Sequence, residues 1–219
     1  MPTLVSIQVA QAETYGEYDA VDPLDRRWTT AFFKKPIDGP VTVGWLGVAG
    51  DSQADVRNHG GRDKAVLAYS SDHYTDWRQD PALAAISGGG FGENLTVTGI
   101  SEATVCIGDT WRVGDVLFEV SQPRQPCWKL GRRWRKPELV KQVVRNGRTG
   151  WYLRVLEEGV IEAGMRMTLE RRVHPEWTIA AANEVMYDRR LPAERIRALI
   201  ALPELSEAWK NELGERVMG

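Results

Sequence analysis

The sequence contains one cysteine whose neighbours favour thiol chemistry. Cys127 lies in the polar segment SQPRQPCWK, residues 121–129, with Arg124 three residues before it and Lys129 two residues after it. Prolines stiffen the backbone and remove N–H donors, and nearby cations stabilise a thiolate. We therefore predict that Cys127 is a functional thiol.

The second cysteine has different surroundings. Cys106 lies in the apolar run ATVCI, which ends at the turn pair Gly108-Asp109. A cysteine in such a run behaves as a small hydrophobic residue, so we expect Cys106 to be buried in a strand. Two cysteines in an intracellular chain are expected to be thiols rather than partners in a disulfide.

Three further clusters are richer in polar residues and glycine than strands require: residues 33–36, residues 50–55 with 57–64, and residues 91–95. In the second cluster, Gly60 and Gly61 could form a backbone nest for an oxyanion. Charge there would come from His59, Arg62 and Lys64. The spacing matches neither a P-loop nor a Rossmann fingerprint, and a solvent-exposed glycine turn is the alternative.

Protein side chains alone are not expected to hold a metal ion. The histidines are scattered, the two cysteines lie 21 residues apart, and no CxxC, HxxxH or HExxH pattern occurs. The GxSxG turn of a serine hydrolase is also absent. One activated thiol near anion-binding loops is the arrangement expected when a metal arrives inside an anionic cofactor and the protein adds one soft sulfur ligand.

Composition disfavours several classes of function. The chain has 219 residues, of which 42% are hydrophobic, with 28 Lys and Arg against 30 Asp and Glu and a formal net charge of -2. This balance leaves no basic excess for binding a nucleic acid polymer, and no window reaches the ~18 apolar residues of a membrane span. The N-terminal MPTLVS lacks the features of a signal peptide. We expect a cytoplasmic protein with no membrane association.

The elements that must position these residues are mostly short strands. Val5, Ile7 and Val9 alternate with polar residues, and residues 41–45 show a similar alternation. Further strands are predicted at 29–33, 65–69, 94–98, 110–113, 116–121, 151–156 and 165–170. Many short strands separated by glycine-containing turns favour a mainly β fold that closes, or nearly closes, into a barrel.

Helices are predicted in two places within the strands and then at the end of the chain. One spans 70–77, and another begins at Pro137 and ends before Gly147. Three helical patterns follow at 178–186, 192–202 and 203–217. Because about 45 residues of helix provide little core of their own, we expect this small α-helical domain to pack on the barrel or on a second subunit, as in a homodimer.

Several motifs occur in a definite order along the chain. They are GDSQAD (50–55), HGGRDKAV (59–66), Tyr69, HY (73–74), Trp77, FGENL (91–95), GD (108–109) and SQPRQPC (121–127). Together they resemble the MOSC-domain proteins, and specifically the bacterial YiiM-like group. The resemblance implies a MOSC-type β-barrel over residues 1–170, followed by the small three-helix domain of this group over residues 175–219.

This resemblance also implies a cofactor and an activity. The barrel would hold the molybdenum cofactor (Mo-molybdopterin), and Cys127, which stands at the place of the family's cysteine, would ligate the metal through its thiolate. Similar proteins reduce N-hydroxylated compounds, such as 6-hydroxylaminopurine, to amino compounds. Their electrons come from a separate flavoprotein or a heme or iron–sulfur protein, and this chain has no recognisable flavin, nicotinamide or iron–sulfur motif.

The candidate site residues combine both kinds of reasoning. Cys127 and His59 are the candidate catalytic residues, since an imidazole exchanges protons near neutral pH, although His59 could instead hold the glycine loop. The candidate cofactor-binding residues are Lys34, Gly60, Gly61, Arg62, Lys64, Asn94 and Arg124. Trp128 and Trp77 could stack on a pterin or purine, with core packing as the alternative.

Two other functions fit Cys127. MOSC domains also form the C-terminal part of molybdenum-cofactor sulfurases, so the chain could be a cofactor-binding or sulfur-carrier module that holds a persulfide on Cys127 without turnover. A redox-sensing thiol protein without a cofactor would leave the glycine loops unexplained. We therefore expect a molybdenum-dependent reductase of N-hydroxylated compounds, with the sulfur carrier as the main alternative.

Overall fold

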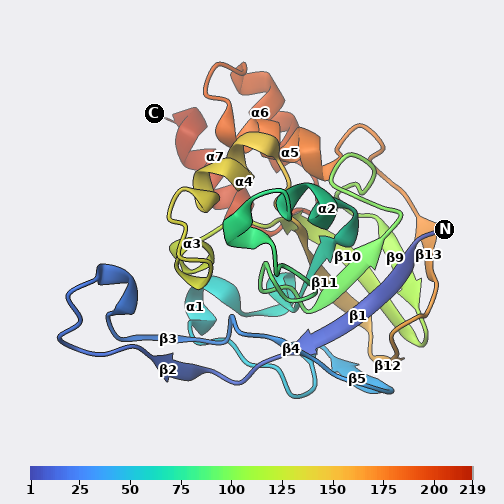
Figure 1. The fold of residues 1–219 in the computed structure, drawn as a ribbon. Coiled ribbons are helices and arrows are strands. Elements are labelled where there is room, and N and C mark those ends of the chain that lie inside the picture. Colours follow the sequence, from blue (N-terminus) through green and yellow to red (C-terminus); the bar gives the residue numbers. More distant parts are fainter. Residues whose placement is uncertain (219) are drawn as a thin grey trace.

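A computed structural model describes residues 1–218, and one curled sheet of eight strands dominates it (Figure 1). Across the sheet, the strands are β13 (Met167–Arg171), β9 (Thr110–Val113), β10 (Val116–Pro123), β11 (Trp151–Glu157), β7 (Val66–Ser70), β8 (Leu95–Thr98), β1 (Thr3–Val9) and β4 (Lys35–Pro36). All neighbours are antiparallel except β7 and β8, which run parallel. The sheet is therefore mixed.

The sheet curls until strands from its two sides meet. The N–H of Leu4 donates to the carbonyl of Met165 at 2.9 Å, and the N–H of Met167 donates to the carbonyl of Pro2 at 3.0 Å. These bonds join the start of β1 to the start of β13. The structure thus confirms the expected mainly β, barrel-like fold, in which curling removes part of the exposed sheet edge.

Strand β7 separates two apolar clusters. Val66 and Ala68 are buried in the main core inside the curled sheet. Tyr69 belongs to a second cluster, where its ring stacks on Phe91 with centroids 4.1 Å apart. A strand that is buried on both faces is typically a continuous apolar run, and residues 65–69 of this chain read AVLAY. The second cluster matters for function because Phe91 also lines the pocket described below.

Two small sheets flank the large one. One contains β12 (Gly159–Ile161), β5 (Val41–Gly44) and β6 (Gly47–Val48). The other pairs β2 (Glu13–Tyr15) with β3 (Trp28–Thr30) in an arm that projects from the body of the protein (Figure 1). The strand predicted at 29–33 is thus shorter and begins one residue earlier.

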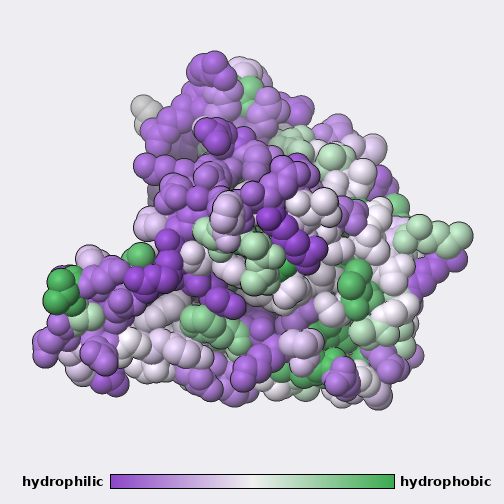
Figure 2. Space-filling model, in the orientation of Figure 1, coloured by the Kyte–Doolittle hydropathy of each residue, from purple (hydrophilic) through white to green (hydrophobic). Residues whose placement is uncertain are grey.

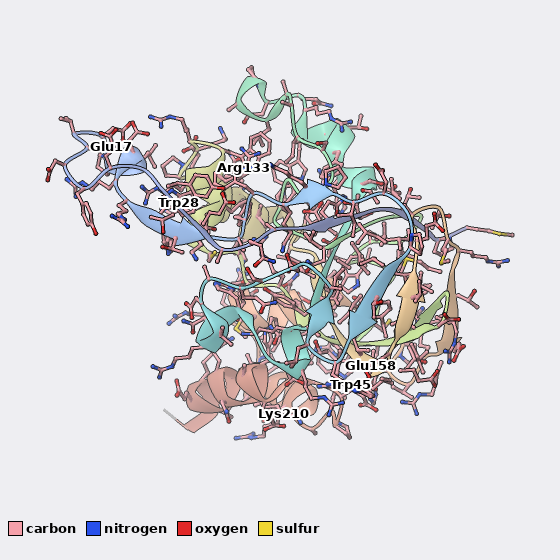
Figure 3. The ribbon with its side chains drawn as sticks, turned by 90° about the horizontal axis from the view of Figure 1, so that it is seen from below. Glu17, Trp28, Trp45, Arg133, Glu158 and Lys210 are labelled. Carbon is pink, nitrogen blue, oxygen red and sulfur yellow. The ribbon has the colours of Figure 1, made fainter. Side chains whose placement is uncertain are left out.

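The arm is held against a short helix, α3 (Trp128–Arg133). Arg132 donates from Nε to the carbonyl of Leu24 at 2.9 Å, and its guanidinium lies 4.7 Å from the ring centroid of Trp28. The guanidinium of Arg133 likewise lies 4.6 Å from the ring centroid of Phe33. Figure 3 shows Trp28 and Arg133 at this junction. Such cation–π contacts fix the base of the arm, which leads into the pocket wall.

The other helices inside the barrel region are α1 (Val56–His59), α2 (Tyr74–Trp77) and α4 (Leu139–Asn146). The helix predicted at 70–77 is a 3₁₀ turn over Ser71–His73 that continues into α2. Helix α4 ends at Gly147, whose φ of 71° is the left-handed conformation that glycine adopts at helix ends. Helices α1 and α3 were not predicted, because four- and six-residue helices carry almost no periodic signal.

The C-terminal helices are α5 (Ile179–Tyr187), α6 (Ala193–Ile200) and α7 (Glu207–Met218), close to the predicted ranges. Trp209 and Leu213 of α7 are buried in the same core as the sheet. The N–H of Ser206 donates to the carbonyl of Ser121 at 3.0 Å. Of the two expected packing modes, these helices therefore use the barrel of their own chain. Within residues 1–218, no helix is long and apolar enough to cross a membrane.

Candidate active site around Cys127

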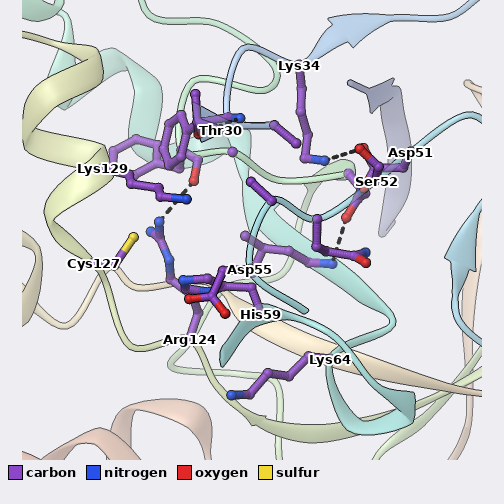
Figure 4. Close-up of a pocket in the computed structure, with 18 of the residues that line it drawn as sticks. Thr30, Lys34, Asp51, Ser52, Asp55, His59, Lys64, Arg124, Cys127 and Lys129 are labelled. Atoms are coloured by element: carbon purple, nitrogen blue, oxygen red, sulfur yellow. Dashed lines mark hydrogen bonds and ion pairs between the residues drawn. The ribbon is translucent and has the colours of Figure 1, made fainter. Parts of the chain in front are cut away.

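One pocket contains Cys127 and most of the candidate site residues (Figure 4). Its wall comes from five segments and one strand residue: residues 30–34 at the base of the arm, 51–59, 64–67, 91–94 and 124–129, with Tyr152 of β11. These segments are far apart in the sequence. They meet where β10 of the curled sheet ends and β8 begins, next to the segments that follow β3 and β6 of the two small sheets.

The path of the backbone explains why Cys127 reaches the pocket. Strand β10 ends at Pro123, and the chain then leaves the sheet because Pro126 cannot donate a ladder hydrogen bond. The N–H of Arg124 still donates to the carbonyl of Gly150 at 3.0 Å, which fixes the start of this segment. Cys127 is extended, with φ of -102° and ψ of 167°, and immediately precedes α3.

The surroundings of Cys127 favour its thiolate form. Burial by itself raises the pKa of the thiol, but hydrogen bonding by the His59 ring, the charge of Arg124 and the N–H of Lys129 outweigh burial and lower the pKa to about 7. Cys106 differs from Cys127 and is buried as predicted, but it lies in no strand and forms only an isolated bridge with Thr178. Its Sγ contacts the carbonyl of Pro175 at 3.7 Å, and burial raises its pKa.

Arg124 carries an unused buried donor. Its side chain is 4% exposed, and Nη2 donates to the carbonyl of Phe91 at 3.1 Å. Nη1 is buried and has no hydrogen-bond partner in the part of the chain that the structure describes. An unpaired charged donor in such a place costs free energy unless a ligand completes it. An anionic group in the pocket would do so.

Lys34 lines the pocket but is paired with a carboxylate. Its ammonium forms a buried ion pair with Asp51 (Figure 4), and burial lowers the pKa of Lys34. Asp51 also accepts hydrogen bonds from the N–H of Ala10 at 2.9 Å and from Nδ2 of Asn94 at 2.8 Å. Asn94 in turn accepts from the N–H of Leu67. The pair and Asn94 therefore brace the pocket wall.

The glycine loop after α1 contributes fewer side chains than expected. Lys64 lines the pocket and donates from Nζ to the carbonyl of Asn58 at 2.8 Å. Arg62 instead stacks on Trp45, with its guanidinium carbon 4.6 Å from the ring centroid. The backbone N–H of Trp45 donates to Oε1 of Glu158 at 2.9 Å, and Figure 3 shows these two residues.

The structure thus brings six of the predicted site residues together and separates three. Cys127, His59, Lys34, Lys64, Asn94 and Arg124 line the pocket, whereas Gly60, Gly61 and Arg62 lie outside its lining. The left-handed φ of 91° at Gly61 starts the 3₁₀ turn over Arg62–Lys64. The glycines therefore shape the loop that carries Lys64.

Glu93 organises the loop beside the pocket and does not line it. It is fully buried and accepts hydrogen bonds from the N–H groups of Gly89 at 2.7 Å and Phe91 at 2.9 Å. The hydroxyls of Tyr74 and Thr96 also donate to it. Burial raises the pKa of Glu93, although these hydrogen bonds lower it in part.

Lys129 and Tyr152 are among the pocket residues that were not named as site residues from the sequence. Lys129 donates from Nζ to the carbonyl of Thr29 at 3.1 Å and so joins α3 to the arm. Tyr152 is buried on β11, and burial raises its pKa to about 12. The cationic neighbourhood of Cys127 had pointed to Lys129. Tyr152 had no local signal, because only the pairing of β10 with β11 places it beside the thiol segment.

Comparison with known proteins places the chain in a family. The MOSC domain family matches residues 55–168, and the family described as YiiM-like, 3-alpha helix domain matches residues 177–219. The chain belongs to the MOSC family. This MOSC protein is 36% identical over 208 residues to YflK of Bacillus subtilis, a match that covers 95% of this chain and 91% of YflK.

Two further relatives bear on fold and function. The MOSC protein superposes on the crystal structure of YiiM from Geobacillus stearothermophilus with a TM-score of 0.81 and 34% identity, covering 99% of this chain and 100% of that one. It is also 40% identical over 178 residues to a protein of Gibberella moniliformis named reductase. That match covers 80% of this chain and 32% of the reductase.

Proposed function

We propose that this MOSC protein is a molybdenum-cofactor-dependent reductase that converts N-hydroxylated compounds, such as 6-hydroxylaminopurine, to amino compounds. The observation that carries the proposal is that one pocket contains both the Cys127 thiol, whose pKa is lowered to about 7, and the Nη1 donor of Arg124 that no described residue uses. The relative named reductase supports the class of reaction.

The pocket residues fit an anionic cofactor with a soft metal. A thiolate such as that of Cys127 is the side-chain ligand that soft metal centres prefer. The Nη1 of Arg124 and the ammonium groups of Lys129 and Lys64 would hold its anionic groups by charge-assisted hydrogen bonds. Within residues 1–218, no three His, Cys, Asp or Glu side chains converge to hold a metal ion, so Cys127 would be a single protein ligand.

The overall reaction is R–NHOH + 2 e⁻ + 2 H⁺ → R–NH₂ + H₂O. Bound molybdenum would supply the two-electron chemistry that breaks the N–O bond. The departing hydroxyl oxygen needs a proton, and His59 is the imidazole in the pocket that can hold one beside the thiolate of Cys127. The buried Arg124 and Tyr152 would orient polar groups and limit the water around them.

The proposal is tested on full-length protein from a host that makes the cofactor. Molybdenum is measured by mass spectrometry and pterin by fluorescence, and reduction of 6-hydroxylaminopurine is followed with dithionite-reduced methyl viologen. We expect both components and turnover in the wild type and in Cys106→Ser, and loss of turnover in Cys127→Ser with an unchanged circular dichroism spectrum. Wild-type protein without molybdenum and pterin, next to a loaded reference molybdoenzyme, would refute the proposal.

The same preparation tests the sulfur-carrier alternative, which the lowered pKa of Cys127 also favours because a thiolate is the form that accepts sulfur. A persulfide on Cys127 appears in an intact mass spectrum as a gain of about 32 Da, the mass of one sulfur atom, and is removed by a reductant. A carrier gives no turnover with the reduced dye. If Cys127 carries a persulfide and the protein gives no turnover with the reduced dye, the sulfur-carrier function would be assigned in place of the reductase function.

A further inference from the structure

A second depression lies on the other side of helix α3 from the pocket. We call it the α3–α4 groove, and its lining includes Leu24, Trp128, Arg132, Pro137, Val140 and Lys141. The first turn of α3 separates it from the active-site pocket. Cys127 and Lys129 line the pocket, whereas Trp128, between them in the chain, lines the groove. A molecule in this groove would therefore contact the residue next to the thiol.

The groove combines apolar and cationic side chains without a carboxylate. Trp128 is 56% exposed, although its ring packs 5.5 Å from that of Trp28. Exposed tryptophan and arginine side chains are the residues most enriched at the centres of protein interfaces. Figure 2 shows that hydrophilic residues surround this region, over α3, α4 and the arm. The groove thus has the composition of a protein contact site.

Positive charge is concentrated here although the chain as a whole is slightly acidic. Residues 124–137 contain six Lys and Arg and no Asp or Glu. Of these six, Arg132 lines the groove, together with Lys141 of α4, whereas Arg124 and Lys129 line the pocket. Two of the six are neutralised, since Arg135 pairs with Asp22 and Asp25, and Lys136 pairs with Asp80 and Glu138. Among the ion pairs of residues 1–218, none involves Arg132 or Lys141 of the groove, and Nη2 of Arg132 is buried without a hydrogen-bond partner.

We propose that the α3–α4 groove docks an acidic one-electron carrier protein. This inference rests on the proposed reductase function and names its partner. Each N–O bond reduced consumes two electrons and two protons, so two molecules of reduced carrier are each oxidised by one electron per turnover. An acidic carrier is attracted by the unpaired Arg132 and Lys141, and Trp128 supplies the apolar anchor beside Cys127.

The experiment compares two electron donors on cofactor-loaded protein. Flavodoxin, a small acidic flavoprotein, is the protein donor, and dithionite-reduced methyl viologen is the small one. In Lys141→Glu we expect the KM for flavodoxin and the Kd measured by calorimetry to rise roughly five- to tenfold, because attraction becomes repulsion. Trp128→Ala should weaken binding without altering its salt dependence. Dye-driven turnover should be unchanged in Lys141→Glu, whose side chain lies in the groove and not in the pocket lining.

The matched control is Arg197→Glu, which reverses an exposed charge on α6 outside the groove lining. It should leave every parameter at the wild-type value. Absence of flavodoxin binding by the wild type would overturn the proposal, as would equal binding by Lys141→Glu. It would also be overturned if Lys141→Glu raised the KM for 6-hydroxylaminopurine with the dye as electron donor. The same holds if the wild type bound a single-stranded oligonucleotide more tightly than flavodoxin. Dye-driven turnover tests the reductase function, and calorimetry tests the docking of the carrier. Failure of the first proposal can therefore be distinguished from failure of the second.

Discussion

The guanidinium of Arg124 and the thiol of Cys127 line the same pocket, three residues apart in the chain, and the charge of the first lowers the pKa of the second. Within residues 1–218, the same guanidinium has a buried Nη1 without a hydrogen-bond partner. One residue therefore supplies both the field that stabilises the thiolate and a donor that remains available for an anion.

Replacement of Arg124 by methionine should separate cofactor retention from folding. Methionine has a similar length and no charge, so the fold should persist while the anion loses a charge-assisted hydrogen bond worth ~1.5–3 kcal/mol. We expect pterin and molybdenum to be retained at least about tenfold more weakly, as measured during dialysis. Arg124→Lys, which keeps the charge, should lie between Arg124→Met and the wild type. Equal retention by all three proteins would contradict this role.

The rate of alkylation should rise through neutral pH. The thiolate is the nucleophile, so a thiol whose pKa is lowered to about 7 reacts half-maximally near pH 7 and reaches a plateau above it. The measurement uses protein that carries Cys106→Ser, so that Cys127 is the cysteine left to react. Iodoacetamide adducts are counted by mass spectrometry. In His59→Ala the midpoint should move to higher pH, because the hydrogen bond that stabilises the thiolate is lost. An unshifted midpoint in His59→Ala would show that His59 does not act on the thiol.

Glu93→Ala should destabilise the fold strongly. It leaves the N–H groups of Gly89 and Phe91 and two hydroxyls without their acceptor, and each buried unsatisfied donor costs ~1–3 kcal/mol. We expect the free energy of unfolding in urea to fall by about 3–5 kcal/mol. Glu93→Gln, which retains one acceptor oxygen, should lose less. Similar urea midpoints for wild type and Glu93→Ala would rule out this structural role.

Glu212 links the last helix to the thiol segment and offers a test of the C-terminal helices. Gln125 donates from Nε2 to Oε2 of Glu212 at 2.8 Å. Because the bond is exposed, Glu212→Ala should cost only about 0.5–1 kcal/mol of unfolding free energy. The larger effect should be faster exchange of the amide protons near Gln125, measured by hydrogen exchange. Glu215→Ala, an exposed change one turn later, is the control and should leave this exchange unchanged.

The strands and the C-terminal helices could be predicted because their signals are local. Alternation of Val5, Ile7 and Val9 predicted a strand where β1 lies, although a bulge between Leu4 and Ser6 leaves Val5 exposed. Thr178 caps α5 by accepting from the N–H of Ala181. The arm could not be predicted as a separate unit. Its two strands have three residues each, and its position depends on contacts with Arg132 and Arg133 from a segment a hundred residues away.

The candidate site divides in the same way. The prolines and cations around Cys127 distinguish it from Cys106 at the level of the sequence, because both burial and thiol reactivity depend strongly on neighbours in the chain. Arg62 and Lys64 have equivalent sequence signals, yet one stacks on Trp45 and the other lines the pocket. Their different positions follow from the left-handed turn at Gly61 and from what each side chain meets in space.

The sequence by itself therefore determined the alternating strands, the helical C-terminal segment and the single cysteine suited to chemistry, since each of these follows from residues within about one turn or strand of one another. Only the tertiary structure decided that Lys34 is paired with Asp51, that Tyr152 stands beside the thiol, and that Arg124 keeps a free donor. These facts depend on which distant segments come into contact where the sheet curls, because contacts between such segments decide whether a side chain is buried and whether a charge is paired.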